Sequence, residues 1–506
     1  MNCKSIILLI VVLLFWGNAE ARKKKGKKVE EVQTESAYRK FFKGKACETA
    51  KGMITLHKMD GRVYFEIPLA LMGREMLMGS TISEITNNGF GSVGEKPKGL
   101  LYISFVRCDS VISLKQLTAQ YDTNEENLKQ RIKESTIPAT IKNFKITTYN
   151  EDSTAVVIDM TDYLVSADEA IDPFSPWAPI LAGGERVMEK EFRRENSQVV
   201  SIKAFEDNVS VKSSLTYGLS LKNKVMYIFQ REPFTAVMTR SFILLPEHPM
   251  RPRLADPRIA IFSQGVSVFN GDSRGAQARY YAQRWNLEPK DMEQYRKGVL
   301  TEPKKPIVFY VDDAFPAMWK EPVRKAALRW NVAFEKIGLK NVIQVRDFPK
   351  DDPTFDPDNL KYSCIRYVPA AITNAMGPSW TDPRTGEIIN ASVIIFNDVV
   401  KLANQWRFLQ TSQVDPSVRT KKMPDNILEE SIEYIVAHEV GHTLGLMHNM
   451  SASAAYPVDS LRSAKFTQKY GTTPSIMDYA RFNYVAQPED KGVKLTPPNL
   501  GIYDEY

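Results

Sequence analysis

The chain has 506 residues, 43% of them hydrophobic and 25% charged, with a formal net charge of +7 at pH 7. Six of the positive charges lie in Arg22–Lys28, so the rest of the chain is close to neutral, which argues against a nucleic-acid-binding protein. Four cysteines in so long a chain exclude a disulfide-held scaffold, and the composition allows a large core held by burial.

Residues 1–21 have the pattern of a signal peptide. Lys4 precedes the apolar run Ile6–Trp16, and Ala19-Glu20-Ala21 matches a signal-peptidase cleavage site. The run is too short for a stable membrane anchor, and no other stretch reaches transmembrane length. We therefore expect a protein that is exported to the periplasm, the cell surface or the medium, without stable membrane insertion. The basic residues 22–40 are expected to form a disordered tail.

Residues 41–300 are dominated by alternating apolar and polar residues, which is typical of strands with one buried face. One helix is expected at Glu125–Lys133. Strands are expected at Arg62–Ile67, Leu100–Arg107, Phe144–Tyr149, Thr154–Met160, Val199–Phe205, Asn208–Tyr217, Val225–Gln230 and Ala236–Leu245. No group of catalytic residues is found here, so we interpret this part as a β-rich N-terminal module.

From residue 301 onward, strands alternate with helices. Strands are expected at Pro306–Val311, Asn341–Arg346, Ser363–Val368 and Ala391–Asn397. A helix opened by Pro322 and closed by Gly338 follows the first strand. A second helix begins after Pro424, and its apolar stripe runs on to Glu439.

The end of that second helix carries the motif H-E-x-x-H-x-x-G-x-x-H, from His438 to His448. Residues four apart lie on one face of a helix, so His438 and His442 can bind the same metal ion. A straight helix would carry His448 about 15 Å along the axis from His438, too far to share that ion. Gly445 can adopt the left-handed backbone that ends a helix, so the chain is expected to turn back there.

Three histidines around one Zn²⁺ leave the fourth tetrahedral position to water, which marks a catalytic site rather than a structural one. Glu439 is placed to take a proton from that water and pass it to a leaving amine. Two other interpretations remain: a surface helix that merely contains histidines, and a site that binds zinc without catalysing a reaction.

These residues resemble the metzincin clan of zinc endopeptidases, whose second signature is a tight turn with a methionine beneath the metal ligands. The resemblance implies that Met477, in Pro474–Tyr479, supports the site and that Tyr479 assists the developing oxyanion. More closely, the chain is similar to exported bacterial zinc-dependent metalloproteases in which a β-rich module precedes the catalytic domain. The resemblance is strongest from Pro303 to the end of the chain.

The resemblance also implies how substrate is held. In metzincins, the strand before the active-site helix pairs with an extended peptide, and here that strand would contain Val393, Ile394, Ile395 and Phe396. An internal core strand is the alternative. The β-rich module could serve as a prodomain that keeps the enzyme latent, as a substrate platform or as a structural brace.

The sequence thus predicts an α+β fold: a β-rich N-terminal module over residues 41–300, then a metzincin-type zinc-peptidase domain over 301–506 with a twisted sheet, active-site helix and Met-turn. We expect this domain to be shortened at its C-terminus, because similar proteins continue further beyond the Met-turn. The expected function is an exported zinc-dependent endopeptidase that hydrolyses proteins or peptides. An inactive or latent metalloprotease-fold binding protein and a zinc hydrolase of non-peptide amides are the alternatives. The sequence leaves the oligomeric state open.

Overall fold

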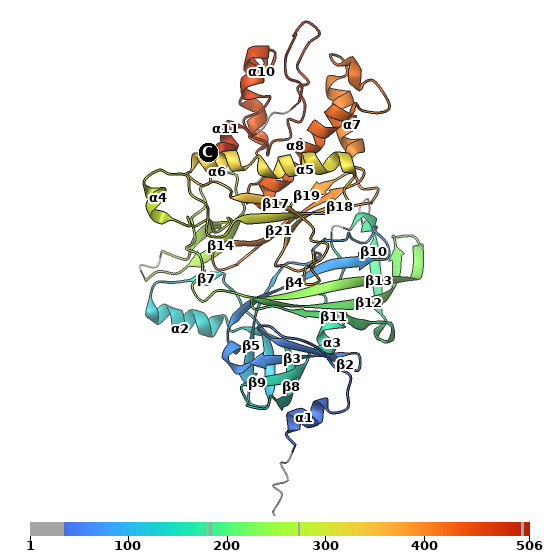
Figure 1. Cartoon of the computed structure of the whole chain (residues 1–506), viewed down its shortest axis with the longest axis vertical. Helices are drawn as coiled ribbons and strands as arrows, with labels where there is room; N and C mark the ends of the chain where they lie inside the picture. Colours follow the sequence, from blue (N-terminus) through green and yellow to red (C-terminus); the bar gives the residue numbers. More distant parts are fainter. Residues whose placement is uncertain (1–34, 177, 182–184, 272–273, 497–499) are drawn as a thin grey trace, which may run out of the picture.

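The structure is a computed structural model, and it describes residues 35–176, 178–181, 185–271, 274–496 and 500–506 (Figure 1). The predicted signal peptide lies outside these ranges, as do residues 22–34 of the predicted tail. The last residues of that tail differ from the prediction, because helix α1 begins at Ala37 and Ser36 caps it by accepting a hydrogen bond from the Arg39 amide. None of the helices in the described ranges has the length and apolar character needed to cross a membrane.

The N-terminal part is built on one large antiparallel sheet, which occupies the lower half of Figure 1. The strand order is β1-β2-β3-β9-β8-β6-β5-β4-β13-β12-β10, and β11 also pairs with β12. The strands are β1 (Glu48–Ala50), β2 (Thr55–Met59), β3 (Arg62–Pro68), β4 (Glu75–Ile85), β5 (Leu101–Cys108), β6 (Val111–Gln116), β8 (Ala139–Tyr149), β9 (Ala155–Asp159), β10 (Val187–Phe192), β11 (Gln198–Ala204), β12 (Asn208–Lys222) and β13 (Tyr227–Leu244). Residues from both ends of this sheet share one hydrophobic core, so the sheet closes around its own apolar face.

Short elements connect this sheet to the rest of the chain. A small sheet of order β15-β14-β7 joins Tyr121–Asp122 (β7) to Ser263–Val268 (β14) and Gln277–Ala282 (β15). The other helices of the N-terminal part are short: α2 (Glu126–Ser135), α3 (Thr161–Leu164) and α4 (Met292–Arg296). The two strands predicted at 225–230 and 236–245 are one continuous strand, β13, because β12 pairs along its whole length.

The C-terminal part is a mixed sheet with helices packed on it, in the upper half of Figure 1. Strands β16 (Ile307–Val311), β17 (Ile343–Asp347), β18 (Ser363–Val368) and β21 (Ile388–Phe396) are parallel, and β19 (Ala375–Met376) and β20 (Ser379–Thr381) pair antiparallel with β21. The helices are α5 (Ala317–Leu328), α6 (Asn331–Lys336), α7 (Val399–Thr411), α8 (Asp425–Thr443), α9 (Val458–Leu461), α10 (Ala464–Tyr470) and α11 (Ile502–Glu505). The single helix predicted around 322–337 is two helices, and Pro322 lies inside α5 rather than at its start.

Helices α5 and α8 cover one face of this sheet and form a core with it. Val393 and Ile395 of β21 face that core, while Ile394 and Phe396 pack on the opposite face of the sheet. The α+β fold class is therefore confirmed, with a β-rich N-terminal part followed by a helix-bearing C-terminal part.

The expectation that Val393, Ile394, Ile395 and Phe396 form the substrate-binding edge is wrong. Strand β21 is internal: β18 pairs with it on one side, and β19 and β20 pair with it on the other. The uninterrupted apolar run in its sequence reflects burial on both faces, which is typical of a central strand in a partly parallel sheet. The edge strands of this sheet are instead β17 and, on the side next to β21, β19.

Candidate active site

Helix α8 carries the first two histidines and the glutamate of the motif. His438 and His442 lie on one face of the helix, with ring centroids 4.8 Å apart, and Glu439 lies beside them. Packing against α5 fixes this stretch, since the indole N–H of Trp330 donates a hydrogen bond to the Ala437 carbonyl at 3.0 Å. The buried face of α8 thus ends in polar residues that open onto a cavity.

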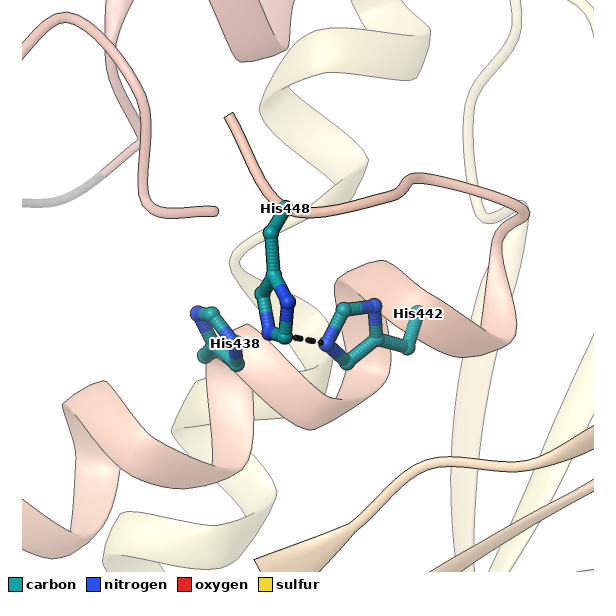
Figure 2. Close-up of side chains that lie close together, drawn as sticks. All are labelled: His438, His442 and His448. Atoms are coloured by element: carbon teal, nitrogen blue, oxygen red, sulfur yellow. Dashed lines mark hydrogen bonds between the residues drawn. The ribbon is translucent and has the colours of Figure 1, made fainter. Parts of the chain in front are cut away.

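The third histidine reaches the first two because the chain turns back at Gly445. Helix α8 ends at Thr443, and Gly445 has a φ of +103°, a backbone conformation that side chains strongly disfavour. The Leu446 amide then donates back to the Gly441 carbonyl at 3.1 Å, which closes the turn. His448 is brought to within a ring-centroid distance of 4.6 Å from His442 (Figure 2).

The three imidazoles have the arrangement that a zinc ion requires. The Nε2 atoms of His442 and His448 are 3.1 Å apart, and one nitrogen from each of the three rings lies within 4.8 Å of the others (Figure 2). Bonds of about 2.0–2.1 Å in a tetrahedral site place two ligand nitrogens roughly 3.3 Å apart. The donor set therefore fits Zn²⁺ in number and type, and the spacing of His442 and His448 is that of two ligands of one ion.

Backbone carbonyls fix the tautomers of two of the rings. His438 Nδ1 donates to the Ile476 carbonyl and His442 Nδ1 to the Leu446 carbonyl, each at 2.8 Å. Because a carbonyl only accepts, Nδ1 must carry the proton, which leaves the Nε2 lone pair free for a metal. Burial also lowers the pKa of His438, to about 3, and that of His442, so both rings are neutral near pH 7.

Glu439 lies 9% exposed at the edge of the cavity, next to these rings. Burial raises the pKa of its carboxyl to about 8, in the protein without a metal. Among the described residues it has no ion-pair or hydrogen-bond partner, so it is not held in a structural contact. A carboxyl group left free beside three histidines is available for proton transfer.

Met477 lies beneath the helix and is fully buried. A side chain on Gly441 would meet the Met477 sulfur at 2.3 Å, so the helix can approach this methionine only through a glycine. The Met477 carbonyl accepts from the Asn449 amide at 2.9 Å, which ties the turn to the residue after His448. The neighbouring Ile476 amide donates to Asp504 at 2.7 Å, so helix α11 also holds this turn.

Tyr479 lies over the histidines, with its ring 4.5 Å from His448 and 5.5 Å from His438. It is 45% exposed, and its hydroxyl makes no hydrogen bond within the described part of the chain. Burial of the remainder raises the pKa of this phenol, so the hydroxyl is protonated near neutral pH and can donate.

A cavity of about 610 Å³ lies in front of these residues. The sheet edge forms one wall, with Asn374–Ser379 including β19, and Glu439, His442, His448 and Tyr479 form the base. Met447 and two residues of the N-terminal part, Phe262 and Gln283, complete the lining. The Phe262 ring is 6.0 Å from that of His442.

Sequence reasoning missed these two residues, because nothing in their local sequence marks them. The main chain brings them in: the Phe262 amide donates to the Gly445 carbonyl at 2.7 Å, and the Met447 amide donates to the Ala260 carbonyl at 2.9 Å. The indole N–H of Trp285 also donates to the Thr443 carbonyl at 2.8 Å. The turn that positions His448 is therefore held by segments of the N-terminal half.

One comparison with known protein families agrees with this geometry. Residues 420–506 match the family model described as Met-zincin, residues 96–290 match a domain of unknown function (DUF5117), and residues 35–85 match another (DUF5118). No curated protein matches the chain. The match to a solved structure, the GM1 bound form of the ECX AB5 holotoxin, is 15% identical and covers 40% of this chain and 77% of that one, with a TM-score of 0.22.

Proposed function

The C-terminal part of this chain is of the metzincin metalloprotease type, and we propose from this premise that the protein is an exported zinc-dependent endopeptidase acting on proteins or peptides. Three imidazoles meet at this site, and backbone carbonyls leave the metal-facing nitrogen of two of them free. Glu439, which has no partner among the described residues, borders the same open cavity, and this arrangement is the observation that carries the proposal.

His438, His442 and His448 would hold the ion. Bound Zn²⁺ would supply a Lewis acid and lower the pKa of a water to about 7. The charge of the ion would lower the pKa of Glu439, whose carboxylate then accepts a proton from the water that attacks the peptide carbonyl carbon. Glu439 returns this proton to the amine nitrogen that leaves when the C–N bond breaks. Tyr479 donates its free hydroxyl to the oxygen on which negative charge develops.

The sheet edge offers a means to hold an extended substrate. No described strand pairs with the outer side of β19, and this side borders the cavity. A peptide can add to such an edge through main-chain hydrogen bonds, which orient it without demanding a particular sequence. This role belongs to Asn374–Ser379 instead of the predicted β21.

Endopeptidase action, rather than trimming of chain ends, is supported by the space on both sides of the glutamate. Glu439 borders the cavity of about 610 Å³ shared with His442 and His448, and also a second pocket of about 220 Å³ shared with His438. An internal peptide bond needs room for residues on each side of the scissile bond. The proposal of export rests on the sequence pattern of residues 1–21. We also propose that the protein does not bind nucleic acid and does not insert stably into a membrane.

The test compares Glu439→Ala with wild type and with Glu430→Ala, which removes an exposed carboxylate from the same helix. Metal content is measured by mass spectrometry, and cleavage is measured on a denatured protein substrate. We expect all three proteins to bind one zinc ion, and only Glu439→Ala to lose cleavage. Zinc binding without cleavage by wild type would favour the inactive binding protein, and unchanged turnover in Glu439→Ala would refute the assigned base.

A further inference from the structure

The second pocket, of about 220 Å³, lies on the His438 side of the metal centre. Helix α8 contributes Tyr434 and Ile435 to it, and helix α7 contributes Leu402 and Trp406. Most of these walls are apolar or aromatic. The one cationic side chain that lines the pocket is Arg481, which follows the Met-turn.

Arg481 has no anionic partner within the described residues. Its guanidinium carbon lies 3.8 Å from the centre of the Trp406 ring and 5.1 Å from that of Tyr479. Its Nε is buried and makes no hydrogen bond to the described protein atoms. The guanidinium thus lines the pocket without a carboxylate bound to it, and an anion entering the pocket would pair with this positive charge.

An unbonded buried Nε also occurs at Arg240, Arg284 and Arg407 among the described residues, so what distinguishes Arg481 is its place in a pocket beside the metal centre. Arg407, on the neighbouring helix α7, pairs with Asp415 at 3.0 Å, and Arg366 forms an ion pair with Asp358. Near Arg481, Asp478 is already occupied, because its carboxylate accepts hydrogen bonds from Ser453 and Thr473 at 2.8 Å each.

The backbone at Arg481 also has an uncommon conformation. Its φ is +56°, in the left-handed region that residues other than glycine, asparagine and aspartate rarely adopt. The guanidinium carbon lies 3.8 Å from the centre of the Trp406 ring, and the side chain lines the pocket beside the metal centre.

We propose that this pocket is a specificity site for an acidic side chain of the substrate, with Arg481 binding the carboxylate of a glutamate or aspartate next to the scissile bond. The inference rests on the proposed peptidase function. A planar guanidinium can bind a carboxylate through two parallel hydrogen bonds, and the apolar walls accept the methylene groups of the same side chain. The cation–π contact with the Trp406 ring restricts the position of the guanidinium.

The test uses the full-length, zinc-loaded protein and cleavage profiling of a peptide library by mass spectrometry. We expect wild type to favour glutamate or aspartate at one position beside the scissile bond. For a peptide pair that differs only by glutamate or glutamine there, kcat/KM should differ by about 10- to 100-fold, as expected for a charge-assisted hydrogen bond.

The variants sharpen the result. Arg481→Gln should bring this ratio close to one, Arg481→Lys should restore part of it, and Arg481→Glu should shift the preference to lysine or arginine. Arg131→Gln is the matched control, because it removes an exposed arginine from helix α2 and should leave the ratio unchanged. A wild-type ratio near one, or a ratio that survives in Arg481→Gln, overturns the inference while the peptidase function stands.

A binding measurement separates failure of this inference from failure of the proposed function. Calorimetry compares two peptidyl hydroxamates that differ only in carrying glutamate or glutamine next to the metal-binding group. Tighter binding of the glutamate compound, lost in Arg481→Gln, supports the acidic pocket even if wild type cleaves no peptide, which would refute the peptidase function alone. Equal binding of both compounds by wild type overturns the acidic pocket.

Discussion

A side chain on Gly445 would collide with the main chain of Gln283, because a Cβ at position 445 would lie 2.2 Å from the Gln283 carbonyl oxygen. Gly445 lies in the turn that brings His448 to the metal centre, and Gln283 belongs to the N-terminal half and lines the cavity. The glycine therefore serves two purposes: it permits the positive φ, and it lets another part of the chain approach the turn. The metal site and the N-terminal half are built against each other.

The first prediction concerns this close contact. Gly445→Ala should lower stability by about 1–3 kcal/mol through the backbone conformation alone, and further through the collision with Gln283. It should also weaken zinc binding, because His448 can no longer keep its place. Gly298→Ala is the control, since Gly298 has a φ of +77° with nothing within 4 Å of its added Cβ. Urea denaturation and zinc titration of both variants measure the difference, and equal effects would show that the collision is relieved without consequence.

The second prediction concerns the role of the N-terminal half. Residues 297–300 form an exposed segment, so a site for a specific protease can be inserted after Gly298. We expect the two halves of the nicked protein to elute together from a gel-filtration column and to keep zinc, because Trp285 and Phe262 remain bonded to the turn after α8. Separation in native buffer, with full cleavage activity in the C-terminal half, would instead identify a removable prodomain.

The features predicted correctly from sequence are those that short spacing determines. The four-residue spacing of His438 and His442 placed both on one helix face, and the glycine at 445 indicated the turn that returns His448. The α+β class followed from the change of periodicity along the chain. Each of these properties depends on residues within a few positions of each other.

The parts that sequence could not predict depend on contacts between distant segments. Strand β19 has only two residues and precedes Gly377 and Pro378, so it carries no strand pattern of its own, and β21 was mistaken for the sheet edge. Phe262 is placed at the cavity by a main-chain hydrogen bond, which a residue of almost any type could make. The role proposed for Arg481 depends on its contact with Trp406, which lies on helix α7 and is distant in sequence.

The third prediction concerns a buried ion network between the two sheets. Asp358 forms ion pairs with Arg366 of β18 and, at 3.3 Å, with Lys212 of β12. Burial alone would raise the pKa of the Asp358 carboxyl, but Arg366 and Lys212 outweigh it, so this pKa lies below its ordinary value. Asp358→Asn should lower stability at pH 7 by about 3–5 kcal/mol, because it leaves a buried arginine unpaired.

The sign of the pH dependence follows from the lowered pKa. A carboxylate with a depressed pKa in the folded state stabilises the protein above its unfolded pKa of about 3.9, and this contribution is lost as the pH falls through the folded value. The gap in urea midpoint between wild type and Asp358→Asn should therefore be full at pH 7 and narrow below about pH 4. Asp256→Asn, in an exposed pair with Arg258, is the control and should change little. A gap that does not change with pH would contradict the network.

The fourth prediction concerns the Tyr479 hydroxyl. Tyr479→Phe keeps the ring that stacks near His448 and removes only a hydroxyl without a hydrogen-bond partner among the described residues, so stability and zinc content should not change. If the hydroxyl donates to the developing oxyanion, kcat should fall by about 10- to 1,000-fold while KM stays nearly constant, because the bond forms only in the transition state. Tyr484→Phe, at a tyrosine that is also exposed and close in sequence, is the matched control. An unchanged kcat would mean that Tyr479 only packs against the histidines, and Glu439 would then act without this donor.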